Sequence, residues 1–191
     1  KNSVVVGYQN NAAGGPADES GKIIYGAANT ANRESSLALG NQNKAINKSA
    51  SAIGVGNTAS GEASVAMGNV STASGDRSVA IGSGANATQG AAIATGSSAV
   101  ALGYLNKATN NVAVGVGVNN KVSGQGATSI GSSNTVTGDN SSVLGRQNTV
   151  DGASVAGAVA VGYQNKASGD RAIAIGESND SKVEDTITMG H

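Results

Sequence analysis

A short phrase of the type Ser-apolar-small-apolar-Gly recurs along this chain, and the repeat limits the possible folds more than any other feature. It appears as SVVVG, SLALG, SVAMG, SVAIG, AVALG, AVAVG and AIAIG. The final glycines, which we call the anchor glycines, stand at Gly7, Gly26, Gly40, Gly54, Gly68, Gly82, Gly96, Gly103, Gly115, Gly131, Gly145, Gly162, Gly176 and Gly190. Most of the intervals between them have the same length, as from Gly40 to Gly54 and from Gly54 to Gly68. The sequence therefore predicts one repeat domain over residues 1–191, built as a stack of short coils of equal length.

A second half-phrase follows most anchor glycines. Asn often stands three positions after the glycine, as at Asn43 and Asn57, and Ala or Val usually follows two positions later. Another glycine, such as Gly61, often comes two positions after that. Each coil is thus predicted to contain two short strands and two turns, with Asn and Gly supplying the left-handed backbone of the turns. The predicted fold class is all-β.

The first strand of each repeat alternates large and small apolar residues. The residue before the anchor glycine is large, as at Ile53 and Ile81, and the preceding residue is usually Ala. Because neither face carries charge, we expect both to be buried. We interpret the large residues as filling the space between two sheets of a roll, which leaves the alanines for a subunit interface, although the reverse facing is also possible. The predicted interface alanines are Ala38, Ala52, Ala66, Ala80, Ala101, Ala113, Ala160 and Ala174.

Composition argues against several classes of function. The chain has no Phe, Trp or Cys, its formal net charge is zero, and its one histidine is the terminal His191. Scattered charges give no surface for nucleic acid, and no stretch approaches the roughly 20 apolar residues of a membrane helix, so we expect no nucleic-acid partner and no direct membrane contact. No catalytic pair, cofactor motif or metal-ligand cluster stands out, and hexapeptide-repeat acyltransferases need an internal histidine that this repeat lacks. We therefore predict a protein that is not an enzyme and has no cofactor.

The stretch SLALGNQNKAINKSASAIGVGNTASGEASVAMGNVSTASGDRSVAIGSGANA resembles the head repeats of trimeric autotransporter adhesins, the YadA-like group. The resemblance covers nearly the whole chain. It implies a left-handed parallel β-roll, three chains side by side as a homotrimer, and exposure outward from a bacterial outer membrane. It also implies a host partner, either a matrix protein such as collagen, fibronectin or laminin, or an epithelial receptor. A structural spacer of the same surface fibre, without a ligand of its own, is the alternative.

Departures from the regular period are the places where a receptor-binding surface could have been added. The first follows Gly7, the second lies between Gly96 and Gly131, and the third covers residues 150–158. Tolerated surface loops would also explain them, and Tyr residues just after anchor glycines could pack at corners instead of binding a ligand. The candidate receptor-binding residues in the first two segments are Pro16, Asp18, Glu19, Tyr104, Leu105, Val116 and Val118.

Overall fold

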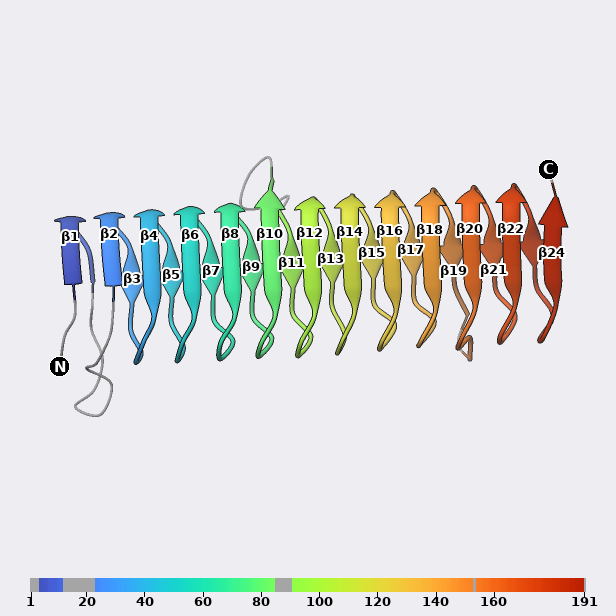
Figure 1. The fold of residues 1–191 in the computed structure, drawn as a ribbon, viewed down its shortest axis with the longest axis horizontal. Coiled ribbons are helices and arrows are strands. Elements are labelled where there is room, and N and C mark those ends of the chain that lie inside the picture. Colours follow the sequence, from blue (N-terminus) through green and yellow to red (C-terminus); the bar gives the residue numbers. More distant parts are fainter. Residues whose placement is uncertain (1–3, 12–22, 85–90, 153, 191) are drawn as a thin grey trace.

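The computed structural model describes residues 4–11, 23–84, 91–152 and 154–190. They form a solenoid in which each coil contributes one longer and one shorter strand (Figure 1). The longer strands are β1 (Val4–Tyr8), β2 (Ile23–Ala27), β4 (Leu37–Asn41), β6 (Ser51–Val55), β8 (Val65–Asn69), β10 (Val79–Ser83), β12 (Val100–Tyr104), β14 (Val114–Val118), β16 (Thr128–Ser132), β18 (Ser142–Arg146), β20 (Val159–Tyr163), β22 (Ile173–Glu177) and β24 (Ile187–Gly190). The shorter strands are β3 (Thr30–Ala31), β5 (Lys44–Ala45), β7 (Thr58–Ala59), β9 (Thr72–Ala73), β11 (Ile93–Ala94), β13 (Lys107–Ala108), β15 (Lys121–Val122), β17 (Thr135–Val136), β19 (Thr149–Val150), β21 (Lys166–Ala167) and β23 (Asp180–Ser181).

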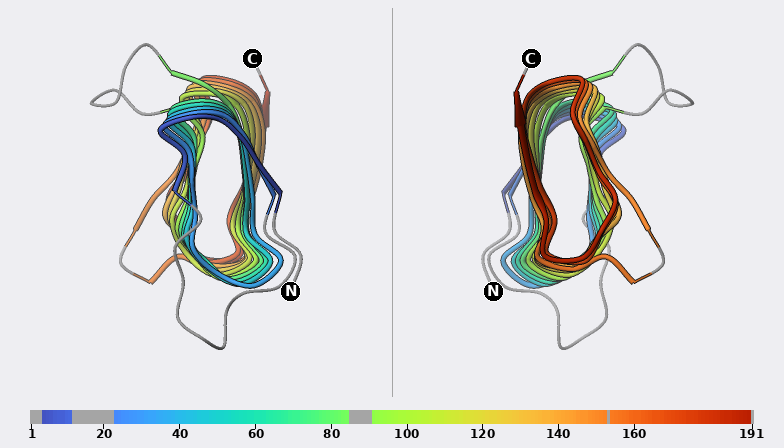
Figure 2. Two further views of the ribbon diagram at one scale, coloured as in Figure 1. Left: turned by 90° about the vertical axis from the view of Figure 1, so that its left-hand side faces the viewer. Right: turned by 90° about the vertical axis from the view of Figure 1, so that its right-hand side faces the viewer.

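Within the described ranges, the longer strands pair in parallel as one 13-stranded sheet and the shorter strands as one 11-stranded sheet. We call these the long sheet and the short sheet. Equivalent residues of neighbouring coils pair, so that Gly54 lies beside Gly68 and Thr58 beside Thr72. Seen along its axis, the roll encloses a narrow interior between the sheets (Figure 2). The all-β class, the parallel roll and the regular coil length are confirmed.

The facing that we preferred for the first strand is wrong. The predicted interface alanines are fully buried inside the single chain, while the larger residues beside them point outward and are partly exposed. So short a coil closes around too little space for two layers of Val and Ile, and small side chains therefore fill it from both sheets. The corrected positions are Ala38, Ala52, Ala66, Ala80, Ala101, Ala113, Ala160 and Ala174, whose side chains belong to the core.

The glycines that the sequence pattern assigned to the repeat between Gly96 and Gly131 are also corrected. Gly103 pairs with Gly117, and Gly117 with Gly131, which restores the regular period there. Gly115 occupies the interior position of an alanine, and Ala113 precedes β14 in the turn. The extra residues lie instead between β10 and β12. These two strands pair in register, although their anchor glycines, Gly82 and Gly103, are further apart in the sequence than one regular repeat.

The interior residues change in the coils where the Ala pattern fails. A Cβ atom built at Gly115 of β14 would lie 3.5 Å from the side chain of Val122 on β15. The next coil has Ser129 in the long strand and Val136 in the short strand, and the coil after it has Val143 and Val150. The interior therefore accommodates Val in the short strand from β15 to β19, and a smaller residue in the long strand offsets the added volume only at Gly115.

With Gly117 in place of Gly115 and with Gly96 left out, the anchor glycines up to Gly176 are required by close contact between successive coils. Gly54 has a φ of 118°, and a Cβ atom there would lie 2.1 Å from the carbonyl oxygen of Gly68 in the next coil. No larger residue fits such a position without moving the backbone. This contact explains why the glycine recurs in every phrase.

The asparagines three positions after the anchor glycines do not supply the left-handed turns that the sequence suggested, although Asn119 and Asn140 at other positions do have positive φ. At the first corner of each coil the residue just before the Asn has positive φ, as at Gln42 and Gln147. The Asn side chain points inward and forms a buried ladder that runs from coil to coil. In one step, the Asn120 backbone N–H and side-chain amide donate to Oδ1 of Asn106, at 2.9 Å each. The same amide group donates to the carbonyl oxygens of Val116 at 3.0 Å and Gly131 at 2.8 Å.

Removing one rung should destabilise the roll strongly. We expect Asn120→Ala to lower the free energy of unfolding by about 3 kcal/mol, because it removes the side-chain hydrogen bonds to five neighbouring residues. Lys121→Ala, at the exposed next position, should cost less than about 0.5 kcal/mol. Urea unfolding of both variants at one protein concentration measures the difference. Equal losses would show that the ladder does not stabilise the fold.

The facing of the long strand can be tested at adjacent residues. Ala66→Leu should lower the free energy of unfolding by about 1–3 kcal/mol, because Ala66 is fully buried in a space without room for a larger side chain. Met67→Leu should cost less than about 1.5 kcal/mol, since Met67 lies on the outer face. Thermal and urea unfolding supply the comparison. A well-tolerated Ala66→Leu would contradict the inward facing of the alanines.

Candidate functional site

The outer face of the long sheet is apolar along the rod. It is formed by the first and third residues of each longer strand, and we call it the long-sheet face. Its third-position residues are Val6, Tyr25, Leu39, Ile53, Met67, Ile81, Leu102, Val116, Ile130, Leu144, Val161, Ile175 and Met189. Its first-position residues are also mostly apolar, with Ser51, Thr128 and Ser142 as exceptions. Leu144 is 52% exposed, and a continuous apolar surface of this kind marks an interaction site.

The structure separates the predicted residues of the second segment. Tyr104 and Val118 are the last residues of β12 and β14 and lie side by side in register. Leu105 follows Tyr104 at the corner, with a φ of 57°. Val116 lies apart from this group, on the long-sheet face. All four belong to regular coils, so the departure from the period that the sequence suggested between Gly96 and Gly131 is wrong.

Tyr104 and Tyr163 occupy equivalent positions but differ in environment. Tyr104 is 41% exposed. Tyr163 is half-buried, and the guanidinium of Arg146 in the preceding coil lies 5.4 Å from the centre of its ring. A contact of this geometry is a cation–π interaction. The corner tyrosines therefore include one that packs against a neighbour and one that offers an accessible ring.

The first and third departures from the period are placed differently. Pro16, Asp18 and Glu19 lie outside the described residues, so their predicted role is untested by the structure. The third departure does interrupt the coils, since β18 pairs with β20 although their anchor glycines, Gly145 and Gly162, are more than one regular repeat apart. There the chain leaves the roll before β20, as the orange trace in Figure 2 shows. Asp151 in this excursion forms an ion pair with Lys166 at 3.2 Å, and Val155 packs back into the core.

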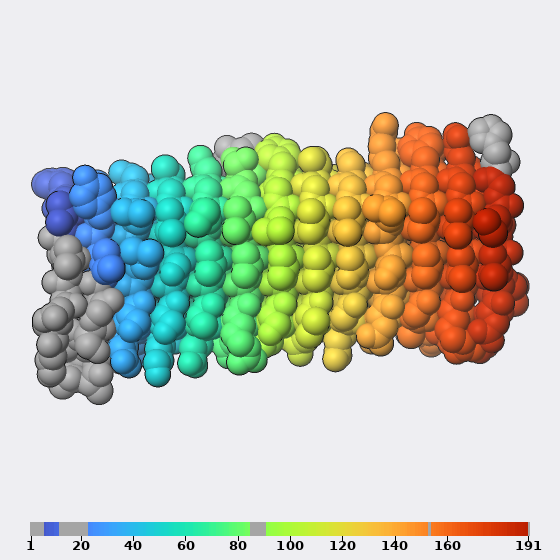
Figure 3. All heavy atoms as spheres, in the orientation of Figure 1, coloured from blue at the N-terminus to red at the C-terminus, as the bar shows by residue number. Residues whose placement is uncertain are grey.

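The outer face of the short sheet is polar. Its first-position residues are Thr30, Lys44, Thr58, Thr72, Ile93, Lys107, Lys121, Thr135, Thr149, Lys166 and Asp180. The roll therefore has one apolar and one polar flank. Figure 3 shows the stacked coils as parallel ridges along the rod.

A group of charges lies near the C-terminal end of the described chain. The Arg171 guanidinium donates to Asp185 at 2.6 Å and also contacts Glu184 and Asp170. The hydrogen bond from Arg171 lowers the pKa of the Asp185 carboxyl below its ordinary value. The same bond, together with the one to Glu184, raises the pKa of Arg171. These groups are exposed and form a surface ion-pair network.

Side chains that could bind a metal ion do not gather anywhere in the described chain. Across residues 4–11, 23–84, 91–152 and 154–190, no three His, Cys, Asp or Glu side chains come together as a metal site. Within those ranges there is also no helix of the length and apolarity that crossing a membrane would need.

The repeat matches one known family. The model of the YadA head domain repeat matches residues 45–71, 59–85, 73–104, 94–119, 123–148 and 156–176. The chain belongs to the YadA head family. The matches follow the coils of the roll and include β14 and β16, where the sequence alone suggests a different phase. A search of curated proteins finds no match.

Membership of the YadA head family identifies this segment as the head of a trimeric autotransporter adhesin. Adhesin heads act by binding through their surfaces, so the relevant features of this YadA head are its flanks, corners and excursions. Sequence reasoning named Tyr104 and Val118, which the structure places at one exposed corner, and it located the excursion before β20. It missed the long-sheet face, although the large residue before each anchor glycine was the signal that could have located it.

Proposed function

We propose that this YadA head attaches a bacterium to its host by binding an extracellular matrix protein or an epithelial receptor. The family match across the stacked coils is the observation that carries this proposal. The form of the head supports it, because a rigid rod displays side chains at a distance from the surface that bears it. In this proposal the head lies outside the bacterial outer membrane and makes no contact with the bilayer.

We also propose that three chains assemble through their long-sheet faces. The support is the apolar surface itself, which runs from β2 to β24 and would remain in contact with water in a single chain. Burying such a surface between copies is favourable at about 25 cal/mol per Å². The interface that we assigned to alanines would then be formed by the larger residues of the same strands. The polar short sheet would stay on the outside of the trimer.

A charge on the long-sheet face should prevent assembly. Leu144→Asp is expected to convert a particle of about three chain masses into smaller species, because it would bury an unpaired carboxylate at the interface. Val112→Asp is the matched control and should leave the mass unchanged. Val112 is 56% exposed, and it lies at a turn away from the long-sheet face, where the equivalent residues of other coils include the charged Arg77 and Asp185. Sedimentation equilibrium measures both variants. An unchanged mass for Leu144→Asp, or a monomeric parent chain, would contradict the arrangement.

The adhesive role is tested by direct binding. The purified chain should bind saturably to at least one of immobilised collagen, fibronectin, laminin or cultured epithelial cells. A variant in which Tyr104 and Val118 are both replaced by Ser should show whether the exposed corner of β12 and β14 contributes, with Val183→Ser as an exposed apolar control. No saturable binding to any of these surfaces would favour the role of a structural spacer.

A further inference from the structure

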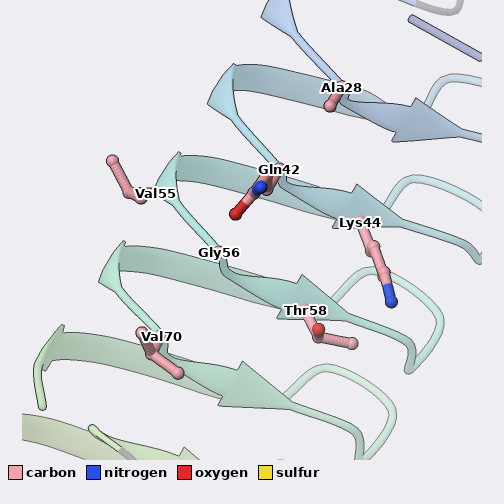
Figure 4. Close-up of a pocket in the computed structure, with 7 residues that line it drawn as sticks. All are labelled: Ala28, Gln42, Lys44, Val55, Gly56, Thr58 and Val70. Carbon is pink, nitrogen blue, oxygen red and sulfur yellow. The ribbon is translucent and has the colours of Figure 1, made fainter. Parts of the chain in front are cut away.

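One corner of the roll contains a depression that a missing side chain opens. It has a volume of about 430 Å³ and is lined by Ala28, Gln42, Lys44, Val55, Gly56, Thr58 and Val70. These residues come from the ends of long strands, the starts of short strands and the corners that connect them. Figure 4 shows Gln42, Gly56 and Val70 at the same corner of three successive coils. We call this depression the Gly56 pocket.

Gly56 is not required by the backbone. Its φ is 67°, and the equivalent Gln42 and Val70 have φ of 55° and 60° while carrying side chains. It is not required by packing either, because the nearest atom to a Cβ built there is Val70 Cγ2, at an ordinary 3.7 Å. The anchor glycine Gly54 differs, since its Cβ would strike a carbonyl oxygen. What the glycine at position 56 does is leave a gap between its neighbours.

The walls of this gap combine apolar surface with one positive charge. Val55 is 47% exposed at the end of β6, and Val70 and Ala28 extend the apolar part. Lys44 begins β5, where its neighbours on the short sheet are the neutral Thr30 and Thr58. None of the described residues that line the pocket is acidic, so none of these side chains neutralises the Lys44 ammonium. Convergent apolar and polar groups in a concave site are typical of ligand pockets.

We propose that the Gly56 pocket binds a peptide segment in which an aliphatic side chain stands next to a carboxylate. The aliphatic group fills the space left at Gly56, between Gln42 and Val70 and beside Val55, and the carboxylate pairs with Lys44. Gln42 and Thr58 supply hydrogen-bonding groups at the rim. The proposal rests on the adhesive function, which makes a host protein the source of the peptide, and it names the chemistry that one site of the head recognises. Three copies in a trimer would add avidity to a weak individual contact.

The probe is the blocked dipeptide acetyl-Leu-Asp-amide, added to the intact chain with ¹³C-labelled valine methyl groups. We expect the Val55 and Val70 methyl resonances to shift and saturate, with a dissociation constant on the order of 1 mM, as a ligand of this size allows. Acetyl-Leu-Asn-amide should bind roughly fivefold more weakly because it lacks the charge. Acetyl-Ala-Asp-amide should also bind more weakly because it leaves the apolar part unfilled.

Variants distinguish the pocket from a general surface effect. Gly56→Gln, which copies the residue of the preceding coil, should weaken acetyl-Leu-Asp-amide binding at least tenfold. Gly157→Gln is the matched control, and this variant should bind the dipeptide as the parent chain does. Gly157 lies at the opposite corner with a φ of 65°, and a Cβ atom built there would lie 3.6 Å from Cγ of Arg171. Lys44→Gln should remove the preference for Asp over Asn. Circular dichroism and sedimentation verify that each variant remains folded and assembled.

Two results would overturn the proposal. One is the absence of saturating shifts at about ten times the expected dissociation constant. The other is binding that Gly56→Gln leaves intact. The test is independent of adhesion: if the dipeptide binds but no matrix protein does, the pocket stands and the adhesive role fails. If a matrix protein binds and the dipeptide does not, the pocket is rejected and the adhesive surface lies elsewhere.

Discussion

The narrow interior of the roll is the constraint on which the rest of the structure depends. Each coil is so short that the space between the two sheets admits Ala, Ser, Asn and a few Val or Ile side chains. The larger residues of the long strands are therefore forced outward, where they form the long-sheet face. A soluble β-protein usually buries its large apolar residues within its own chain. Here the core is filled by small residues, and the large ones remain available to another surface.

The same interior holds a polar ladder, which is unusual for a hydrophobic core. Asn43 shows the usual pattern, in which the side-chain amide donates to the carbonyl of Leu39 in its own coil, the carbonyl of Gly54 in the next coil and Oδ1 of Asn29 in the preceding coil. Such satisfied networks specify one arrangement, because any shift between coils would leave buried groups unpaired. The ladder is interrupted in two coils, where Ser71 and Ala92 stand in place of Asn. The Ser71 hydroxyl donates to the carbonyls of Met67 and Gly82 in place of an Asn amide. That change accompanies the extra residues between β10 and β12.

A solenoid with a fixed interior leaves its corners free to vary. The corner residue is Gln42 in one coil, Gly56 in the next and Val70 in the one after, with nearly the same backbone conformation. Chemistry at the corners can thus change from coil to coil without altering the roll. Adhesion to a host and the pocket proposed at Gly56 both fit this division, in which the interior specifies the rod and the corners specify what it contacts.

The repeat in the sequence determined the all-β class, the parallel coils and their two strands, because a regular period leaves few other ways to bury a chain of small residues. It also located the excursion before β20. Only the tertiary structure decided which face of the long strand is inside, since alternation separates two faces without saying which one the interior can accommodate. The phase at Gly117 needed the register with Gly103 and Gly131, because GVG offers two glycines two residues apart. The role of the asparagines also depended on neighbouring coils, since their partners lie 11 and 14 residues away in the chain and meet only after the coils stack.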